Sequence, residues 1–372
     1  MKILITGGAG FIGSFLVDEL VRQGHQVRIF DNLEPQVHPG GEAPDYLNPR
    51  AEFIRADLRN REALSRAVKG MEIIFHQAAM VGVGQSMYQV SRYVEANSLG
   101  TANLLDILVN DKHHVRKLLI PSSMSTYGEG SYDCPDCGPV SPPLRPEEQM
   151  ERGDWEVYCP VCGKICSPAS TPESKLQEIN SIYALSKKDQ EEMSILIGKS
   201  YRLPVVALRY FNVYGPRQSL SNPYTGVAAI FLSRLKNRRR PLVFEDGLQS
   251  RDFISVHDIV RANLMAMDDP RADGTIYNVG SGRQLTVLDI AETLARLLDV
   301  DIEPEILGKF RKGDVRHCFA DITKIKTELG FKPAVPLEKG MEELIEWSRT
   351  AAAEDKVEQA TRELVEKGLV GD

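Results

Sequence analysis

The chain has 372 residues, of which 42% are hydrophobic and 26% charged, and its formal net charge is −7. That length supports one or two buried cores, while no stretch reaches the roughly 20 apolar residues of a membrane span. The acidic balance gives no general attraction to nucleic acid or to an anionic membrane, so neither is expected as a partner. Because a strand-like run begins at Lys2, we expect no secretory signal and a cytoplasmic protein.

The sequence opens with a strand, a glycine-rich turn and a helix. Lys2–Thr6 is a short apolar run, and helical periodicity starts at Phe11. Glycines between a strand and a helix let backbone N–H groups approach a pyrophosphate, whose charge is favoured at the helix N-terminus. The turn therefore predicts a dinucleotide site, with the candidate ligands Gly7, Gly10, Phe11, Ile12 and Gly13.

A second strand, Gln26–Phe30, ends in Asp31, eighteen residues after Gly13. A carboxylate at this place accepts hydrogen bonds from both ribose hydroxyls and repels a 2′-phosphate. The sequence therefore favours NAD over NADP. The alternative is a tight turn followed by an unrelated acid.

Strands and helices then alternate through the first half of the chain. Further strands are expected at Glu52–Arg55, Glu72–Phe75 and Lys117–Pro121, with helices at Arg61–Lys69 and Ser91–Asn110. This order predicts an α/β fold of the Rossmann type, a doubly wound parallel sheet. Ligands bind outside the carboxyl ends of such strands. The candidate cofactor residues at these ends are Asn32, Asp57, Leu58, Ala78, Ala79 and Ser122.

Residues 129–178 break the pattern and are rich in proline, cysteine and charge. A structureless loop of that length is improbable without a staple. The two motifs CPDCG and CPVCG have the spacing of a zinc ribbon, whose four thiolates leave no open position and make the metal structural. A pair of disulfides and an iron–sulfur site are the alternatives, and Cys166 is interpreted as a spare thiol. The predicted zinc ligands are Cys134, Cys137, Cys159 and Cys162.

The remaining chain predicts a smaller α/β unit that binds the substrate over the sheet edge. A helix at Ile182–Tyr201 and a strand at Pro204–Phe211 complete the first unit, and a helical tail follows at Glu354–Leu369. The expected division is a Rossmann domain at 1–211 with a return segment at 253–282, a zinc-ribbon insertion at 129–178, a second unit at 212–252 and 283–352, and a tail at 353–372. The elements expected in the chain after Phe211 are Gly226–Lys236, Leu242–Glu245, Ile276–Val279, Val287–Leu298 and Leu337–Ala352.

With these motifs, a Ser-Ser pair at a strand end and the run RYFNVYGPRQ, the chain resembles the extended short-chain dehydrogenase/reductase family of nucleotide-sugar epimerases and dehydratases. The resemblance implies that Tyr183 is the general acid/base, that Lys187 is its electrostatic partner and a ribose ligand, and that Ser123 bridges the substrate oxygen. A nearby cation favours a phenolate over the ordinary phenol of pKa about 10. Asn97 matches a family position near the cofactor.

The resemblance also implies a nucleotide diphosphate sugar as substrate. Arg251 and Arg316 stand where the family places diphosphate ligands, and Asn212 where an amide holds the same group. Planar guanidinium groups match phosphate well. Surface ion pairs with neighbouring aspartates are the alternative for both arginines. Small or apolar residues including Val81 are expected to form the wall against the sugar.

The family resemblance also bears on the reaction. Sugar 4,6-dehydratases carry an acidic pair where this chain has Met124 and Ser125, so neither elimination nor decarboxylation is expected. A 4-epimerase with bound NAD remains, with a reductase less favoured because of Asp31. The cysteine-rich insertion, with Arg145 and Trp155, is similar to that of family members that convert dTDP-L-rhamnose to dTDP-6-deoxy-L-talose. UDP-hexose and UDP-N-acetylhexosamine epimerases are the rival class.

The family forms homodimers that pair the helix near Ser91–Asn110 with the helix that carries Tyr183, and a homodimer is expected here. A non-enzymatic alternative is an NAD-sensing interaction protein, because zinc ribbons often bind nucleic acid or protein. The basic cluster that would serve such a role is Lys236, Arg238, Arg239 and Arg240. Retention of Ser123, Tyr183 and Lys187 favours an enzyme.

Overall fold

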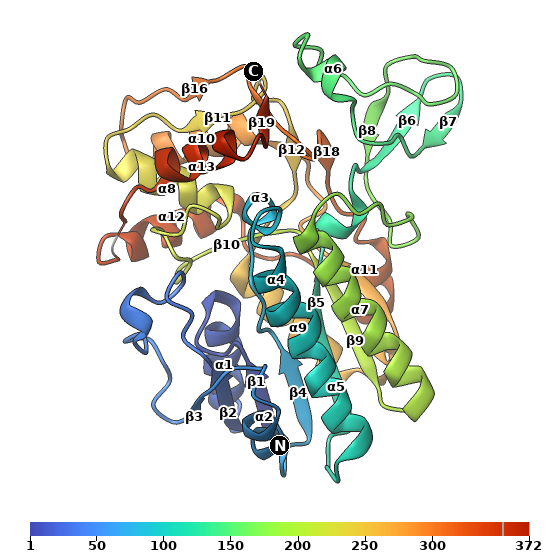
Figure 1. Cartoon of the computed structure of the whole chain (residues 1–372), viewed down its shortest axis with the longest axis vertical. Coiled ribbons are helices and arrows are strands. Elements are labelled where there is room, and N and C mark those ends of the chain that lie inside the picture. Colours follow the sequence, from blue (N-terminus) through green and yellow to red (C-terminus); the bar gives the residue numbers. More distant parts are fainter. Residues whose placement is uncertain (352, 372) are drawn as a thin grey trace.

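The protein is described by a computed structural model that covers residues 1–351 and 353–371. At its centre is a seven-stranded sheet in which every neighbouring pair is parallel, with the order β14-β9-β5-β4-β1-β2-β3 (Figure 1). The strands are β1 Lys2–Thr6, β2 Gln26–Asp31, β3 Glu52–Arg55, β4 Ile73–His76, β5 Lys117–Ser123, β9 Val205–Tyr210 and β14 Ile276–Val279.

Helices cover both faces of this sheet and bury its alternating side chains in two cores. Ile3 and Ile5 of β1 belong to one core, and Leu4 belongs to the other. A strand buried on both faces reads as a continuous apolar run, which explains the predictions of β1, β4 and β5. The doubly wound α/β fold is confirmed. The first face carries α1 Phe11–Arg22, α9 Val256–Asp268 and α11 Thr323–Leu329, and the second carries α2 Arg61–Val68, α5 Gly100–Asn110 and α7 Ile182–Tyr201.

The long helix expected at Ser91–Asn110 is three consecutive segments. They are α4 Val90–Tyr93, a π-helical turn at Val94–Leu99, and α5. The Asn97 side chain, in the π-helical turn, accepts from the Met80 N–H at 2.7 Å and donates to the Met80 carbonyl at 3.0 Å. Single π turns inside α-helices occur frequently at functional sites. This one fixes the loop that follows β4.

The second unit packs its helices around a core of its own, with Leu232, Leu294 and Leu344 completely buried. A capping box formed by Thr286 and Asp289 starts α10. The expected helix end at Ala352 and the last residue, Asp372, lie outside the described residues. The elements are α8 Val227–Lys236, α10 Val287–Leu297, α12 Leu337–Ser348, β10 Asn212–Tyr214, β11 Leu242–Val243, β12 Ser250–Arg251, β13 Phe253–Ser255, β15 Leu285–Thr286, β16 Glu305–Ile306, β17 Phe310–Arg311 and β18 His317–Cys318.

The C-terminal segment after residue 352 folds back over the second unit as α13 Val357–Glu366 and β19 Val370–Gly371, and β19 pairs antiparallel with β17. The basic cluster of the sequence holds it there: Arg239 lies 3.2 Å from both Asp355 and Glu358. Arg240 donates to the carbonyls of Glu303 and Pro304. Both arginines therefore bind other segments of the same chain. None of the helices within the described ranges combines the length and apolar character of a membrane-spanning segment.

The cysteine-rich insertion is a lobe beside the second unit (Figure 1). The lobe buries a small apolar core around Tyr132 and Val157. Its Arg145 reaches out of the lobe and forms a buried ion pair with Glu245, at 2.8 Å. The elements of the lobe are β6 Ser131–Cys134, β7 Gly138–Val140, α6 Glu147–Met150 and β8 Ser167–Ala169.

Candidate active site

A cavity of about 650 Å³ runs along the carboxyl-terminal edge of the sheet and into the second unit. Its volume is in the range of ordinary ligand sites. Asn97 and Arg316 are the two predicted ligands that do not line it. The predicted site residues that it brings together are Gly7, Gly10, Phe11, Ile12, Gly13, Asp31, Asn32, Asp57, Leu58, Ala78, Ala79, Val81, Ser122, Ser123, Tyr183, Lys187, Asn212 and Arg251.

The glycine turn between β1 and α1 requires its glycines for packing. Gly7 has φ +70°, and a Cβ there would lie 2.7 Å from the backbone of Ala78. The turn therefore sits directly against the end of β4. The first N–H groups of a helix have no partner within the helix, and Phe11, Ile12 and Gly13, which form the first turn of α1, line the cavity.

Asp31 is fixed at the end of β2. Its carboxylate accepts from the Ala9 N–H at 3.0 Å and from the Leu33 N–H at 2.9 Å. Next to it, Asn32 donates to Asp57 at 3.0 Å. Burial acts to raise the pKa of Asp57, but hydrogen bonds from Arg59 outweigh it and lower the pKa to about 2. The Asp57 carboxylate therefore remains charged at neutral pH.

Tyr183 lies in the first turn of α7, where Ser86 Oγ accepts its backbone N–H at 3.0 Å. Ser123 ends β5 and lines the same cavity. Burial raises the pKa of the Tyr183 phenol, and a hydrogen bond with the Ser123 hydroxyl opposes that rise. The phenol is thus held neutral and already paired with the predicted second hydroxyl.

Lys187 lies one helical turn after Tyr183, and its side chain is buried. Burial lowers the pKa of this amine to about 7, although the charge of Glu191 acts in the other direction. Its Nζ donates to Gln190 Oε1 at 2.6 Å. The amine is thus directed to Gln190 here, and the role of Lys187 as the electrostatic partner of Tyr183 stays a prediction.

The end of the cavity in the second unit carries the cationic groups. Arg251 donates to Asp314 at 2.9 Å and to the Val315 carbonyl at 2.6 Å. Arg311 and Lys312 also line the cavity, and Arg311 pairs with Asp314. Burial acts to raise the pKa of Asp314, but the two arginines lower it to about 2.

Arg316 differs from the expectation for a diphosphate ligand. Its guanidinium donates to Asp246 at 2.6 Å and 2.8 Å and to Glu245 at 2.9 Å, below the cavity surface. Neither arginine is a surface ion pair, because Arg251 and Arg316 are 8% and 3% exposed. Arg311 and Lys312 line the cavity wall instead of Arg316. The sequence analysis missed both residues, although their closeness to Arg316 in the sequence could have indicated them.

Residues 3–149 and 156–280 match the NAD dependent epimerase/dehydratase family. The chain belongs to this family. It is 36% identical over 349 residues to the dTDP-L-rhamnose 4-epimerase of Burkholderia thailandensis, covering 93% of this chain and 94% of that protein. The UDP-glucose 4-epimerase of Thermotoga maritima, solved with UDP-glucose, superposes with a TM-score of 0.76 at 32% identity, covering 94% of this chain and 99% of that one.

A UDP-glucuronic acid 4-epimerase from Bacillus cereus, solved with UDP-glucuronic acid and NAD, gives a TM-score of 0.76 at 27% identity and covers 94% of this chain and 99% of its own. These proteins are nucleotide-sugar epimerases and hence isomerases. The resemblance inferred from the motifs is confirmed, and this chain is an enzyme of the same NAD-dependent family.

A series of hydrogen-bonded side chains extends from Lys187 into the protein, and no sequence motif predicted it. Gln190, which accepts from Lys187, donates to Thr101 Oγ1 at 2.8 Å, and Thr101 donates to the Asn97 carbonyl at 2.7 Å. His76 Nε2 lies 2.9 Å from the same Thr101 oxygen, and its Nδ1 lies 2.8 Å from Thr6 Oγ1. Burial lowers the pKa of His76 to about 3. A neutral imidazole therefore holds Thr101, and through it Gln190, in one orientation.

Asn97 acts within the protein. Its side-chain amide accepts from the Met80 N–H and donates to the Met80 carbonyl. It also donates to Ser186 Oγ at 2.9 Å. It therefore ties the loop after β4 to α7, three residues from the predicted acid/base. The family position is occupied as expected, but its contacts here are structural.

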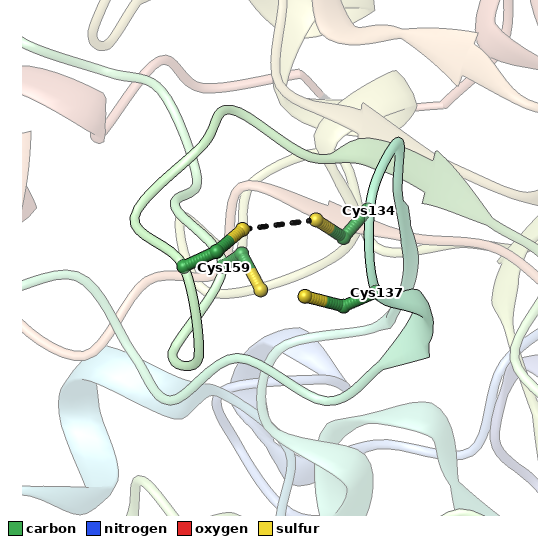
Figure 2. A group of neighbouring side chains, drawn as sticks. Cys134, Cys137 and Cys159 are labelled. Atoms are coloured by element: carbon green, nitrogen blue, oxygen red, sulfur yellow. Dashed lines mark hydrogen bonds between the residues drawn. The ribbon is translucent and has the colours of Figure 1, made fainter.

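The four predicted metal ligands of the insertion converge. The Sγ atoms of Cys134, Cys137, Cys159 and Cys162 lie within 4.8 Å of one another, and Figure 2 shows the labelled side chains turned inward. Two thiols, Cys134 and Cys162, are 3.4 Å apart. Backbone N–H groups of Cys162 and Val161 lower the pKa of Cys159 to about 6. Knuckle geometry of this kind favours thiolates.

Proposed function

We propose that the chain is a nucleotide-sugar 4-epimerase that interconverts dTDP-L-rhamnose and dTDP-6-deoxy-L-talose with tightly held NAD. The observation that carries the proposal is that Ser123, Tyr183 and Lys187 line one cavity with the glycine turn and Asp31. The 36% identity to dTDP-L-rhamnose 4-epimerase supports the substrate. A UDP-hexose or UDP-N-acetylhexosamine is the second candidate substrate, because a solved relative holds UDP-glucose.

The residues present fit NAD. The open N–H groups at the start of α1 suit a pyrophosphate, and Asp31 keeps lone pairs for ribose hydroxyls while opposing a 2′-phosphate. Ser122 lines the cavity with a buried hydroxyl oxygen that has no partner within the described residues. Such an orphaned group is costly unless a ligand satisfies it. Lys187 is the further ribose ligand in this proposal.

Bound NAD supplies a hydride acceptor and, once reduced, the donor that returns the hydride. The chain itself handles the proton. Tyr183 takes the proton of the sugar C4 hydroxyl as the C4 hydride leaves, and gives it back after the 4-keto sugar has turned in the cavity. Ser123 donates a hydrogen bond to the same oxygen and so favours the ketone carbonyl. The Lys187 ammonium favours the Tyr183 phenolate once it is redirected from Gln190.

The cavity lacks a free acid for elimination of water. Met124 is buried among apolar side chains, and Ser125 donates to Ser123 at 2.9 Å. A hydroxyl and a thioether neither donate nor accept protons near neutral pH. Within the described residues the acids of the cavity wall are each held by a cation or by backbone N–H groups. They are Asp31, Glu34, Asp57 and Asp314.

The diphosphate is assigned to Arg251, Arg311 and Lys312, with Asn212 beside them. Asn212 lines the cavity, and in this proposal its side-chain NH2 group donates to a diphosphate oxygen. In this proposal Arg316 does not bind the diphosphate but donates a hydrogen bond to Glu245, below the cavity surface. Two guanidinium groups and an ammonium match the charge of a nucleotide diphosphate.

We further propose that the four cysteines of the insertion hold one structural zinc ion. Four thiolates in a closed cluster leave no coordination position for a substrate. Their convergence supports the site. Metal binding contributes free energy to folding in such modules, which suits a lobe with a small core.

A homodimer is proposed through α4, α5 and α7, which lie side by side (Figure 1). Ser98 of the π turn donates to Asp189 of α7 at 2.7 Å. These helices leave large apolar side chains exposed, which supports a protein partner on this face. They are Val90, Val94, Leu99, Leu185 and Leu196.

The test is proton NMR of dTDP-L-rhamnose incubated with the purified enzyme and no added NAD. A new talo-configured species of unchanged mass is expected. If dTDP-L-rhamnose is unchanged while a UDP-hexose is epimerised, the second candidate replaces the first. If any sugar nucleotide loses water, the argument from Met124 and Ser125 is wrong.

A further inference from the structure

The C-terminal segment forms part of the wall of the cavity. The residues of α13 that line the cavity are at helical spacing and share one face of the helix. Four of the five side chains on this wall are apolar. The segment contributes Val357, Ala360, Thr361, Leu364 and Leu369.

Three sets of contacts hold this segment in place. Glu363 accepts hydrogen bonds from Tyr88 at 3.0 Å and from Tyr224 at 2.9 Å, and the two phenols are 2.6 Å apart. At one end β19 pairs with β17, and at the other Asp355 is buried against Arg234. A helix fastened at both ends and in its middle is a fixed part of the cavity.

The helix α13 contacts the segment that holds the predicted acid/base. A Cβ on Gly84 would lie 3.0 Å from the Leu364 side chain, so the two segments are in direct contact. Two residues later, Ser86 accepts the backbone N–H of Tyr183. Leu364 therefore faces the part of the cavity where the reacting sugar carbon must lie in the proposed reaction.

This part of the cavity is apolar on its other sides as well. Val81, Val83 and Met87 line it and are 39%, 42% and 42% exposed. Apolar side chains left open in a cavity mark a site for an apolar group. A hydroxyl buried against them loses its hydrogen bonds to water without replacement.

We propose that α13 is a specificity element and that Leu364 selects hexosyl groups with a methyl substituent on the ring over those with a hydroxymethyl group. The inference rests on the proposed function, since it assigns the sugar to this end of the cavity. Apolar sites reject an added hydroxyl by about 10²-fold in kcat/KM. The wild-type enzyme should therefore prefer dTDP-L-rhamnose to dTDP-L-mannose, which differs by one C6 hydroxyl, by about that factor.

The first experiment compares kcat/KM for these two substrates in wild type, Leu364→Asn, Leu364→Met and Val365→Asn. Val365 is 52% exposed on the outer face of the same helix and serves as the matched control. We expect Leu364→Asn to lower the preference about tenfold or more, while Leu364→Met and Val365→Asn keep it. Equal turnover of both sugars by the wild type, or an equal change in both substitutions to asparagine, overturns the inference.

A second measurement does not depend on turnover. Amide hydrogen exchange of residues 357–369 is followed in wild type with dTDP alone and with dTDP-L-rhamnose. Slower exchange only with the sugar nucleotide supports contact with the sugar. Equal protection by dTDP overturns the inference even if the epimerase is active, whereas sugar-dependent protection without epimerisation refutes the proposed reaction and leaves the contact standing.

Discussion

Replacement of Arg145 tests whether the insertion is coupled to the second unit. The Arg145 and Glu245 side chains are each 2% exposed, and their two hydrogen bonds are 3.0 Å and 2.8 Å. Breaking a buried ion pair by removing one partner costs about 3–5 kcal/mol, because it leaves an uncompensated charge. Arg316 continues to neutralise Glu245, so Arg145→Met should cost the lower figure, about 3 kcal/mol.

The assay is urea unfolding, followed by hydrogen exchange over residues 131–169. Arg145→Lys keeps the charge but loses the paired geometry, and an intermediate loss is expected. Arg152→Met, on an exposed residue of the same lobe, is the matched control and should change stability by less than about 0.5 kcal/mol. Equal unfolding midpoints for Arg145→Met and Arg152→Met, with unchanged exchange in the lobe, would refute the coupling.

Tyr183→Phe should abolish turnover while NAD is still retained, measured as nucleotide released on denaturation; full activity would remove Tyr183 from the mechanism. Burial lowers the pKa of Lys187 from 10.5 to about 7, so the unfolded chain binds this proton more tightly than the folded protein. Burying the ammonium therefore lowers the free energy of unfolding by its full amount below pH 7, and this loss disappears as pH rises toward 10.5. Lys187→Met should therefore be more thermostable than nucleotide-free wild type at pH 6, by a margin that shrinks by pH 9; a constant margin contradicts this. Elemental analysis should give about one zinc per chain, and a folded, metal-free protein would end the zinc proposal.

The sequence was most informative where a local pattern determines the structure. The helix that carries Tyr183 begins and ends at the predicted residues, Ile182 and Tyr201, because Ser181 caps it and an extended strand follows. Strand ends on a parallel sheet meet at one edge, so Gly7, Asp31 and Ser123 could be placed together before any contact was known.

Contacts between distant segments were not predictable in the same way. Arg311 and Arg316 lie five residues apart in one loop, and only the fold determines which of them faces the cavity. The chain from Lys187 to His76 joins α7, α5 and β4, three elements with no shared sequence pattern. The tail was predicted as a helix, but its place on the cavity wall depends on Glu363 meeting two tyrosines from other segments.

The insertion leaves and re-enters the protein through neighbouring residues. Ser131 and Ala169 are paired across β6 and β8, and Gly130 and Thr171 hydrogen-bond to the same stretch of chain at His317 and Phe319. A segment whose two ends lie this close can be inserted into a domain or removed from it with little change to the rest of the fold. A short turn in place of the lobe would keep Ser123 and Tyr183 where they are, so evolution can add, lose or replace the lobe without rebuilding the chemistry beside it.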